Sequence, residues 1–138
     1  MSPDVFSQAW IAEWGDELNS SDAYRAAAAA WEGSILFIMA LPTGEERLAF
    51  LDLWHGDCRA ARVASQQDTG DAAFILRATD HDWQRVLSGD IEPIWAMMSG
   101  KLKLERGRTA QLVPHAKAAQ ELVAAARRVD ARRQESSP

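Results

Sequence analysis

The chain has 138 residues, enough for one domain with a hydrophobic core, and its 47% apolar and 25% charged content excludes the disordered and collagen-like classes. Its net charge of −5 is unevenly spread, because residues 1–100 carry 6 Lys/Arg against 16 Asp/Glu and residues 101–138 carry 9 against 4. The acidic body argues against sequence-independent nucleic-acid binding. Two readings of the basic C-terminal third stay open: transient contact with an anionic membrane surface, or, the one we favour, arginines at the negative end of a helix dipole.

The N-terminus predicts an amphipathic helix. Ser2 and Pro3 are typical of a helix start, as a capping serine followed by proline at the first helical position. Phe6, Trp10 and Trp14 follow at four-residue spacing, so they should form one apolar face.

A helix and a buried strand are expected next. Residues 22–31 favour helix because five consecutive alanines at 26–30 are strong helix formers, and Gly33 is a natural stop. Residues 34–41 are apolar at every position and bounded by Gly33 and Pro42. That pattern predicts a strand covered on both faces.

Three further strands are predicted at residues 47–55, 59–66 and 72–79, with a loop at 67–71. Counting the strand at 34–41, the one at 59–66 is the third. It is more polar than the others and is expected near a sheet edge. Alternation along the second strand divides its side chains into two faces: Leu51 and Leu53 on one, and Phe50, Asp52 and Trp54 on the other. The short connections leave little room for crossover helices, so the strands should pair as an antiparallel meander.

The C-terminal half reads as helices around one short strand. A helix is expected from Thr79, a second one capped by Asp90, a strand at 101–105, and a long helix at 109–133. Residues 134–138 read as a frayed tail. The order of elements predicts an α+β fold in a single domain at 1–133.

The residues offer little support for catalysis. Asp52, His55 and Asp57 are close in sequence, but strand alternation sends Asp52 and His55 to opposite faces. The scattered histidines and single cysteine have no metal-ligand spacing, and no cofactor is predicted. Cys58 follows Asp57, whose negative charge should raise the thiol pKa. A lone cysteine and the lack of a targeting signal favour the cytoplasm.

The stretch from Trp83 to Gly107 is the most informative part of the chain. It contains a tryptophan-bearing helix, Gly89, Pro93, two adjacent methionines and a Gly-Lys-Leu-Lys-Leu strand. Methionine is common on surfaces that adapt to several ligand shapes. The stretch, together with residues 30–33 and 51–56, resembles the sterol carrier protein 2 (SCP2) lipid-binding family. One departure is Arg108 after Gly107, where family members commonly carry aspartate.

The resemblance implies a five-stranded, mainly antiparallel sheet covered by helices, with an apolar tunnel between the two. It also implies non-enzymatic binding or transfer of a sterol, fatty acid or fatty acyl-CoA. The tunnel would be lined by Phe50, Trp54, Phe74, Leu76, Trp83, Ile94, Trp95, Met98, Leu102 and Leu104, with Leu122 and Val123 of the C-terminal helix forming a lid.

Two alternatives from other functional classes stay open at this point. One is a module whose apolar groove binds a helix of a partner protein. The other is a small isomerase-type enzyme with a pocket, in which Asp52 or Asp57 is the base.

Overall fold

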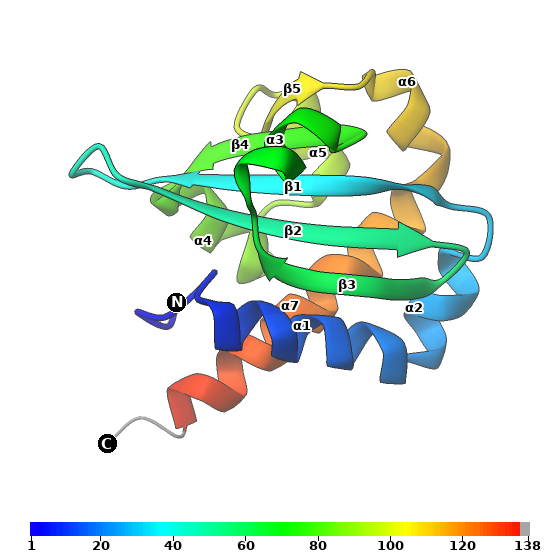
Figure 1. Cartoon of the computed structure of the whole chain (residues 1–138), viewed down its shortest axis with the longest axis horizontal. Coiled ribbons are helices and arrows are strands. Elements are labelled where there is room, and N and C mark those ends of the chain that lie inside the picture. The colour runs from blue at the N-terminus through cyan, green and yellow to red at the C-terminus, as the bar shows by residue number, and fades with distance from the viewer. Residues whose placement is uncertain (136–138) are drawn as a thin grey trace.

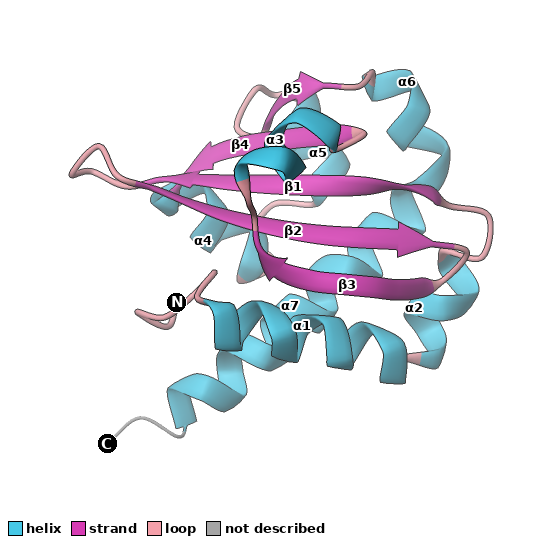
Figure 2. Ribbon diagram, viewed as in Figure 1, coloured by secondary structure: helices cyan, strands magenta, loops and turns pink. Residues whose placement is uncertain are grey.

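The computed structural model describes residues 1–135, which form a five-stranded sheet with most helices packed against one face (Figures 1 and 2). The strands are β1 (Glu32–Ala40), β2 (Glu46–Trp54), β3 (Asp57–Val63), β4 (Phe74–Thr79) and β5 (Lys103–Arg106). The helices are α1 (Gln8–Ser20), α2 (Asp22–Ala27), α3 (Gln66–Asp71), α4 (Asp80–Leu87), α5 (Pro93–Met98), α6 (Thr109–Leu112) and α7 (Ala116–Glu135), with a 3₁₀ turn at Val113–His115. Among residues 1–135, no helix is long and apolar enough to cross a membrane.

The sheet has the strand order β3-β2-β1-β4-β5, and its register confirms a mainly antiparallel sheet with β3 at one edge. The predicted meander is wrong at one point, because β4 pairs with β1 in parallel. The crossover that this pairing needs is supplied by α3, in the segment expected to be a loop. Ser65 caps α3 by accepting from the backbone N–H of Asp68, whose carboxylate accepts from the backbone N–H of Ser65 in return.

Alternation along β1 sends side chains into two separate apolar clusters. Ile35, Phe37 and Met39 face the main core under the helices, whereas Leu36 and Ile38 belong to a smaller cluster on the other face. Residues that flank α3 contribute to the smaller cluster, and Figure 1 shows α3 lying across that face. The prediction that this strand is covered on both faces is confirmed.

The N-terminal helix begins later than the sequence suggests. Ser7, not Ser2, is the cap, and its hydroxyl accepts from the backbone N–H of Trp10 at 3.2 Å. The helix also continues through Gly15. A Cβ at that glycine would lie 2.6 Å from the Cβ of Ala61, so the missing side chain lets α1 pack closely on β3.

The N-terminal segment is held by the C-terminal helix. The carboxylate of Asp130, itself only 7% exposed, accepts from the backbone N–H of Ser2 at 3.0 and 3.2 Å and from the indole N–H of Trp10 at 3.2 Å. Beside this contact, the basic end of α7 forms ion pairs with acidic groups in and before α1: Arg128 with Glu17, Arg132 with Glu13 and Glu17, and Arg133 with Asp4 and Glu13.

Element boundaries differ from prediction where local geometry overrides propensity. The helix expected at 22–31 ends at Ala27, and Gly33 lies inside β1. The long helix expected at 109–133 is divided at the 3₁₀ turn that contains Pro114, since proline provides no N–H. Gln134 and Glu135, predicted to be frayed, belong to α7, and the rest of the predicted tail lies outside the described residues.

Replacing Asp130 tests the anchor between the chain ends. Asp130→Ala leaves the indole N–H of Trp10 without its acceptor and removes the carboxylate that accepts from the N–H of Ser2, so the free energy of unfolding should fall by about 1–3 kcal/mol. Asp130→Asn keeps an acceptor oxygen and should lose less. Urea denaturation followed by tryptophan fluorescence measures both; equal losses would show that the hydrogen bonds contribute little.

Candidate functional site

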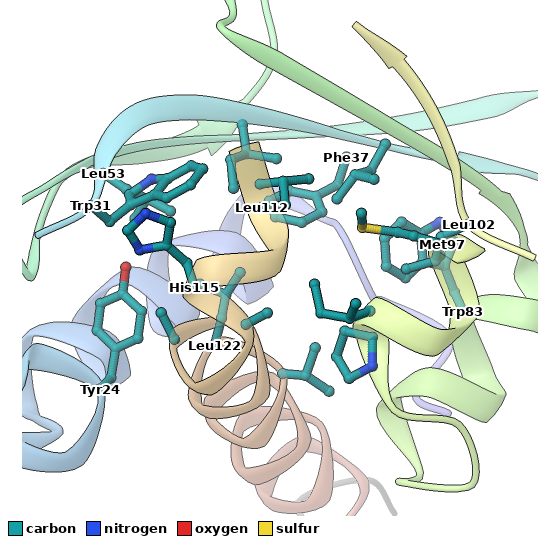
Figure 3. Close-up of a pocket in the computed structure, with 17 residues that line it drawn as sticks. Tyr24, Trp31, Phe37, Leu53, Trp83, Met97, Leu102, Leu112, His115 and Leu122 are labelled. Carbon is teal, nitrogen blue, oxygen red and sulfur yellow. The ribbon is translucent and has the colours of Figure 1, made fainter. Parts of the chain in front are cut away.

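An apolar pocket lies between the helical face of the sheet and the helices (Figure 3). Its floor is formed by side chains of alternate strand positions, Ile35, Phe37, Leu53 and Leu76. Its walls come from α4 and α5 on one side and from α7 on the other. The space open to the centre of a water-sized sphere is about 60 Å³, enough for a few water molecules. The pocket is therefore narrow, and its lining side chains have to shift before a long molecule fits.

Half of the predicted lining residues face this pocket. These are Leu76, Trp83, Ile94, Leu102, Leu122 and Val123. They come from a strand, two helices of the central region, the segment before β5, and α7. That these side chains contact a ligand stays a prediction, but the fold does bring them together.

Phe50 and Trp54 lie on the opposite face of the sheet and do not line the pocket. Phe50 packs in the smaller cluster beneath the Arg62 guanidinium, and Trp54 is 40% exposed with Arg59 over its ring. The sequence contained the signal for this face. Asp52 lies between the two aromatics at two-residue spacing, so all three side chains share one face of the strand. A carboxylate indicates that this face points away from the core.

Trp95 and Met98 are also outside the pocket, on the outer side of α5. They are 57% and 72% exposed, whereas Ile94 and Met97 of the same helix point inward. Helical periodicity explains the difference, because Ile94 and Met97 share one face and Trp95 and Met98 share the next.

The remaining two predicted residues lie beside the lining without forming it. Phe74 is buried, with its ring 5.1 Å from the ring of Trp31 and next to Gly107. The Gly107 backbone has a φ of 96°, and a Cβ there would lie 2.3 Å from Phe74. Leu104 is half-buried and packs against the edge of the core.

Sequence reasoning missed most of one end of the pocket. Tyr24, Trp31, Leu112 and His115 converge there from α2, the segment before β1, α6 and the 3₁₀ turn. Only tertiary packing brings these segments together, so no local sequence pattern predicts that their side chains meet. Two small residues of α7, Ala118 and Ala119, also line the pocket and were not among the predicted residues.

The candidate acid–base residues are engaged elsewhere. Asp52 pairs with Arg59 at 3.0 Å on the far face of the sheet, and Asp57 pairs with Arg25 at 2.9 Å. The ring of His55 lies 2.7 Å from a carboxylate oxygen of Glu32. None of these groups lines the pocket, so an enzyme using Asp52 or Asp57 as base would have to work outside it. Within residues 1–135, no group of three or more His, Cys, Asp or Glu side chains is arranged to hold a metal ion.

Comparison with protein families identifies a match over most of the chain. A model described as the SCP-2 sterol transfer family matches residues 12–106, which include the whole sheet. The sequence of stomatin-like protein 1 from Mus musculus is 33% identical over 69 residues. That match covers 50% of this chain and only 16% of the mouse protein, so the similarity is to a small part of a larger polypeptide.

Solved structures show the same fold. A crystal structure of sterol carrier protein 2 has 41% sequence identity and a TM-score of 0.81, covering 89% of this chain and 97% of its own. A conserved hypothetical protein from Thermus thermophilus, described as possibly a sterol carrier protein, has 42% identity and a TM-score of 0.80, with coverage of 90% and 88%. The apo form of sterol carrier protein 2 from Yarrowia lipolytica, at 20% identity and a TM-score of 0.62, shares the fold; it covers 92% of this chain and 96% of its own.

Cys58 is buried beneath α1 and is not a nucleophile poised for reaction. Burial raises the pKa of its thiol to about 12, with smaller contributions from the negative charges of Asp52 and Asp16. The raised pKa agrees with the sequence-based expectation, although the cause is mainly burial, and the contributing charges differ from the expected Asp57. The thiol therefore stays protonated at neutral pH.

Thiol reactivity tests this assignment. A pKa near 12 leaves almost no thiolate at pH 8, so labelling of Cys58 by a disulfide reagent should be at least about 100-fold slower in the native protein than in urea. The native rate should rise only as the pH approaches 12 or the protein unfolds. Rapid native labelling at pH 8 would show that the thiol is accessible and ionised.

Proposed function

The chain belongs to the SCP-2 sterol transfer family, and on that premise we propose that it binds one lipid non-covalently in the apolar pocket and transfers it without catalysis. The candidate ligands are a sterol, a fatty acid and a fatty acyl-CoA. The observation that carries the proposal is the pocket itself, whose lining is almost entirely aliphatic and aromatic on both the sheet and the helix side. The only cysteine of the chain, Cys58, is a buried free thiol, which is consistent with a reducing cytoplasm.

The energetics favour an elongated ligand. Removing apolar surface from water stabilises a complex by roughly 25 cal/mol per Å², so a buried acyl chain is able to reach micromolar affinity. The narrow free space requires the walls to move outward on binding. Met97 is suited to this because its thioether side chain is unbranched and flexible, and Ala118 and Ala119 leave room along α7.

Filling the pocket should block binding. In the delipidated protein we expect Trp31 and Trp83, which both line the pocket, to transfer excitation energy to one bound equivalent of a fluorescent fatty acid. Ala119→Phe places a ring in the pocket and should weaken this binding at least about tenfold, because the ring occupies the ligand's space.

Ala131→Phe is the matched control, since Ala131 is exposed on the same helix and outside the pocket. It should bind like the unmodified protein, and thermal melts of both variants confirm folding. Equal affinities in the two variants would place the lipid elsewhere. A complete lack of energy transfer in the unmodified protein would instead favour the module whose groove binds a partner helix.

Transfer also needs a surface that meets the membrane. The exposed side chains of Trp95 and Met98 lie on α5, whose inner side walls the pocket, and Lys101 and Lys103 follow directly. We propose that this apolar and basic surface contacts anionic membranes during loading and release. The arginines at the end of α7 are less suited, because Arg128 and its neighbours pair with acids of the N-terminal region.

A double variant separates membrane contact from binding. Trp95→Ser with Met98→Ser should slow fatty-acid transfer to vesicles containing phosphatidylserine by about fivefold or more, because interfacial apolar area is lost. The equilibrium affinity for the fatty acid should not change. Trp54→Ser serves as control, since Trp54 is also exposed but lies on the far face of the sheet. Equal slowing by both variants would remove the special role of α5.

A further inference from the structure

The pocket contains very few polar atoms, and their distribution is uneven. Of the described residues that line it, only Tyr24, Trp31, Trp83 and His115 have a nitrogen or oxygen atom in the side chain. The indole N–H groups of Trp31 and Trp83 donate to backbone carbonyls of β1 at 2.9 and 2.8 Å. These two are therefore already satisfied, which leaves the hydroxyl of Tyr24 and the imidazole of His115.

The side chains of Tyr24 and His115 have no hydrogen-bond partner within the part of the chain that the structure describes. The Tyr24 residue is nevertheless almost completely buried, because it retains only 2% of its exposed surface. The hydroxyl has no partner in the protein, so its hydrogen bonds have to go to water or to a bound molecule that takes the place of that water. No side-chain oxygen or nitrogen in the described residues is both fully sealed from solvent and unpaired, so the hydroxyl opens onto free space.

The two groups lie together at one end of the pocket. Figure 3 shows the Tyr24 hydroxyl directed toward the His115 ring, below Trp31, whereas the opposite end is formed by Trp83, Met97 and Leu102. The His115 ring stands edge-on to Trp31 at 5.0 Å between centroids. The 3₁₀ turn holds His115 in place from one side and α2 holds Tyr24 from the other, so both groups are positioned before any ligand arrives.

The charge at this end is low. No lysine or arginine of residues 1–135 lines the pocket, and burial raises the pKa of the Tyr24 hydroxyl, so Tyr24 is a neutral donor and acceptor. A carboxylate placed here would lose hydration without gaining a lysine or arginine as partner, whereas an alcohol or carbonyl would lose much less.

We propose that Tyr24 and His115 form a head-group site that binds the hydroxyl or carbonyl oxygen of an uncharged lipid, with its chain directed toward Trp83. This inference rests on the proposed function, because it assumes that a lipid occupies the pocket. It goes further in assigning an orientation to the ligand and a class to its head group. The preferred ligand is a neutral lipid that carries one hydrogen-bonding oxygen at its end.

The test compares three twelve-carbon ligands at pH 8: 1-dodecanol, dodecanoate and dodecane, each titrated by displacement of the fluorescent fatty acid. The unmodified protein should bind dodecanol about tenfold more tightly than dodecane, the gain expected of one net hydrogen bond, and more tightly than dodecanoate. Tyr24→Phe removes only the hydroxyl, so it should bring dodecanol close to dodecane and leave the affinity for dodecane unchanged. His115→Phe keeps a ring against Trp31 and should act in the same direction.

The outcomes separate this inference from the proposed function. If none of the three ligands displaces the probe and the probe itself does not bind, the pocket is not a lipid site and both proposals fail. If dodecane and dodecanol bind equally, or Tyr24→Phe weakens both alike, lipid binding stands and the head-group site is refuted. Tighter binding of dodecanoate than of dodecanol would overturn the preference for neutral ligands. Thermal melts show whether each variant is folded, and Tyr24→Phe removes no hydrogen bond formed within residues 1–135.

Discussion

The architecture depends on one constraint, that β1 is apolar on both faces and must be covered twice. Its side chains at 35, 37 and 39 need the helices below the sheet, and those at 36 and 38 need a second cover above it. The crossover through α3 provides that cover and delivers β4 to pair in parallel with β1. Different helices cover the two faces of β1. Every second side chain of the strand therefore points to the helical side, where Ile35 and Phe37 form part of the pocket floor.

The interior on the helical side is solid in one region and hollow in another. Phe6, Trp10, Trp14 and Phe37 pack ring against ring, with centroids 5.0 to 6.4 Å apart, and Trp83 joins them at 5.7 Å from Phe6. Rings at these distances fill space densely and attract one another at their edges. Trp83 therefore belongs both to the filled core and to the pocket wall, which makes the boundary between the two a rigid one.

The strands, the fold class and the buried central strand could be predicted from sequence because alternation and apolar runs are local signals. The family resemblance implied that Phe50 and Trp54 line the tunnel, and this is wrong; the carboxylate of Asp52, on the same strand face as both aromatics, marks that face as the one away from the pocket. The helix at 66–71 was missed because a capped short helix of polar residues looks like a loop. The end of the pocket with Tyr24 and His115 depends on contacts between segments far apart in the chain, and no periodicity encodes such a meeting.

The ion pairs of α7 are concentrated toward its C-terminal end, whereas its pocket-lining residues lie in its first two turns. The helix is therefore fixed to the N-terminal region at its Arg128 end, and nearer its start the backbone carbonyl of Leu122 accepts from the indole N–H of Trp14 at 3.1 Å. Of the pocket-lining residues of α7, only those of the first turn, Ala118 and Ala119, lie ahead of this anchor, so they are the part of the wall that is able to move while the contacts with α1 are kept.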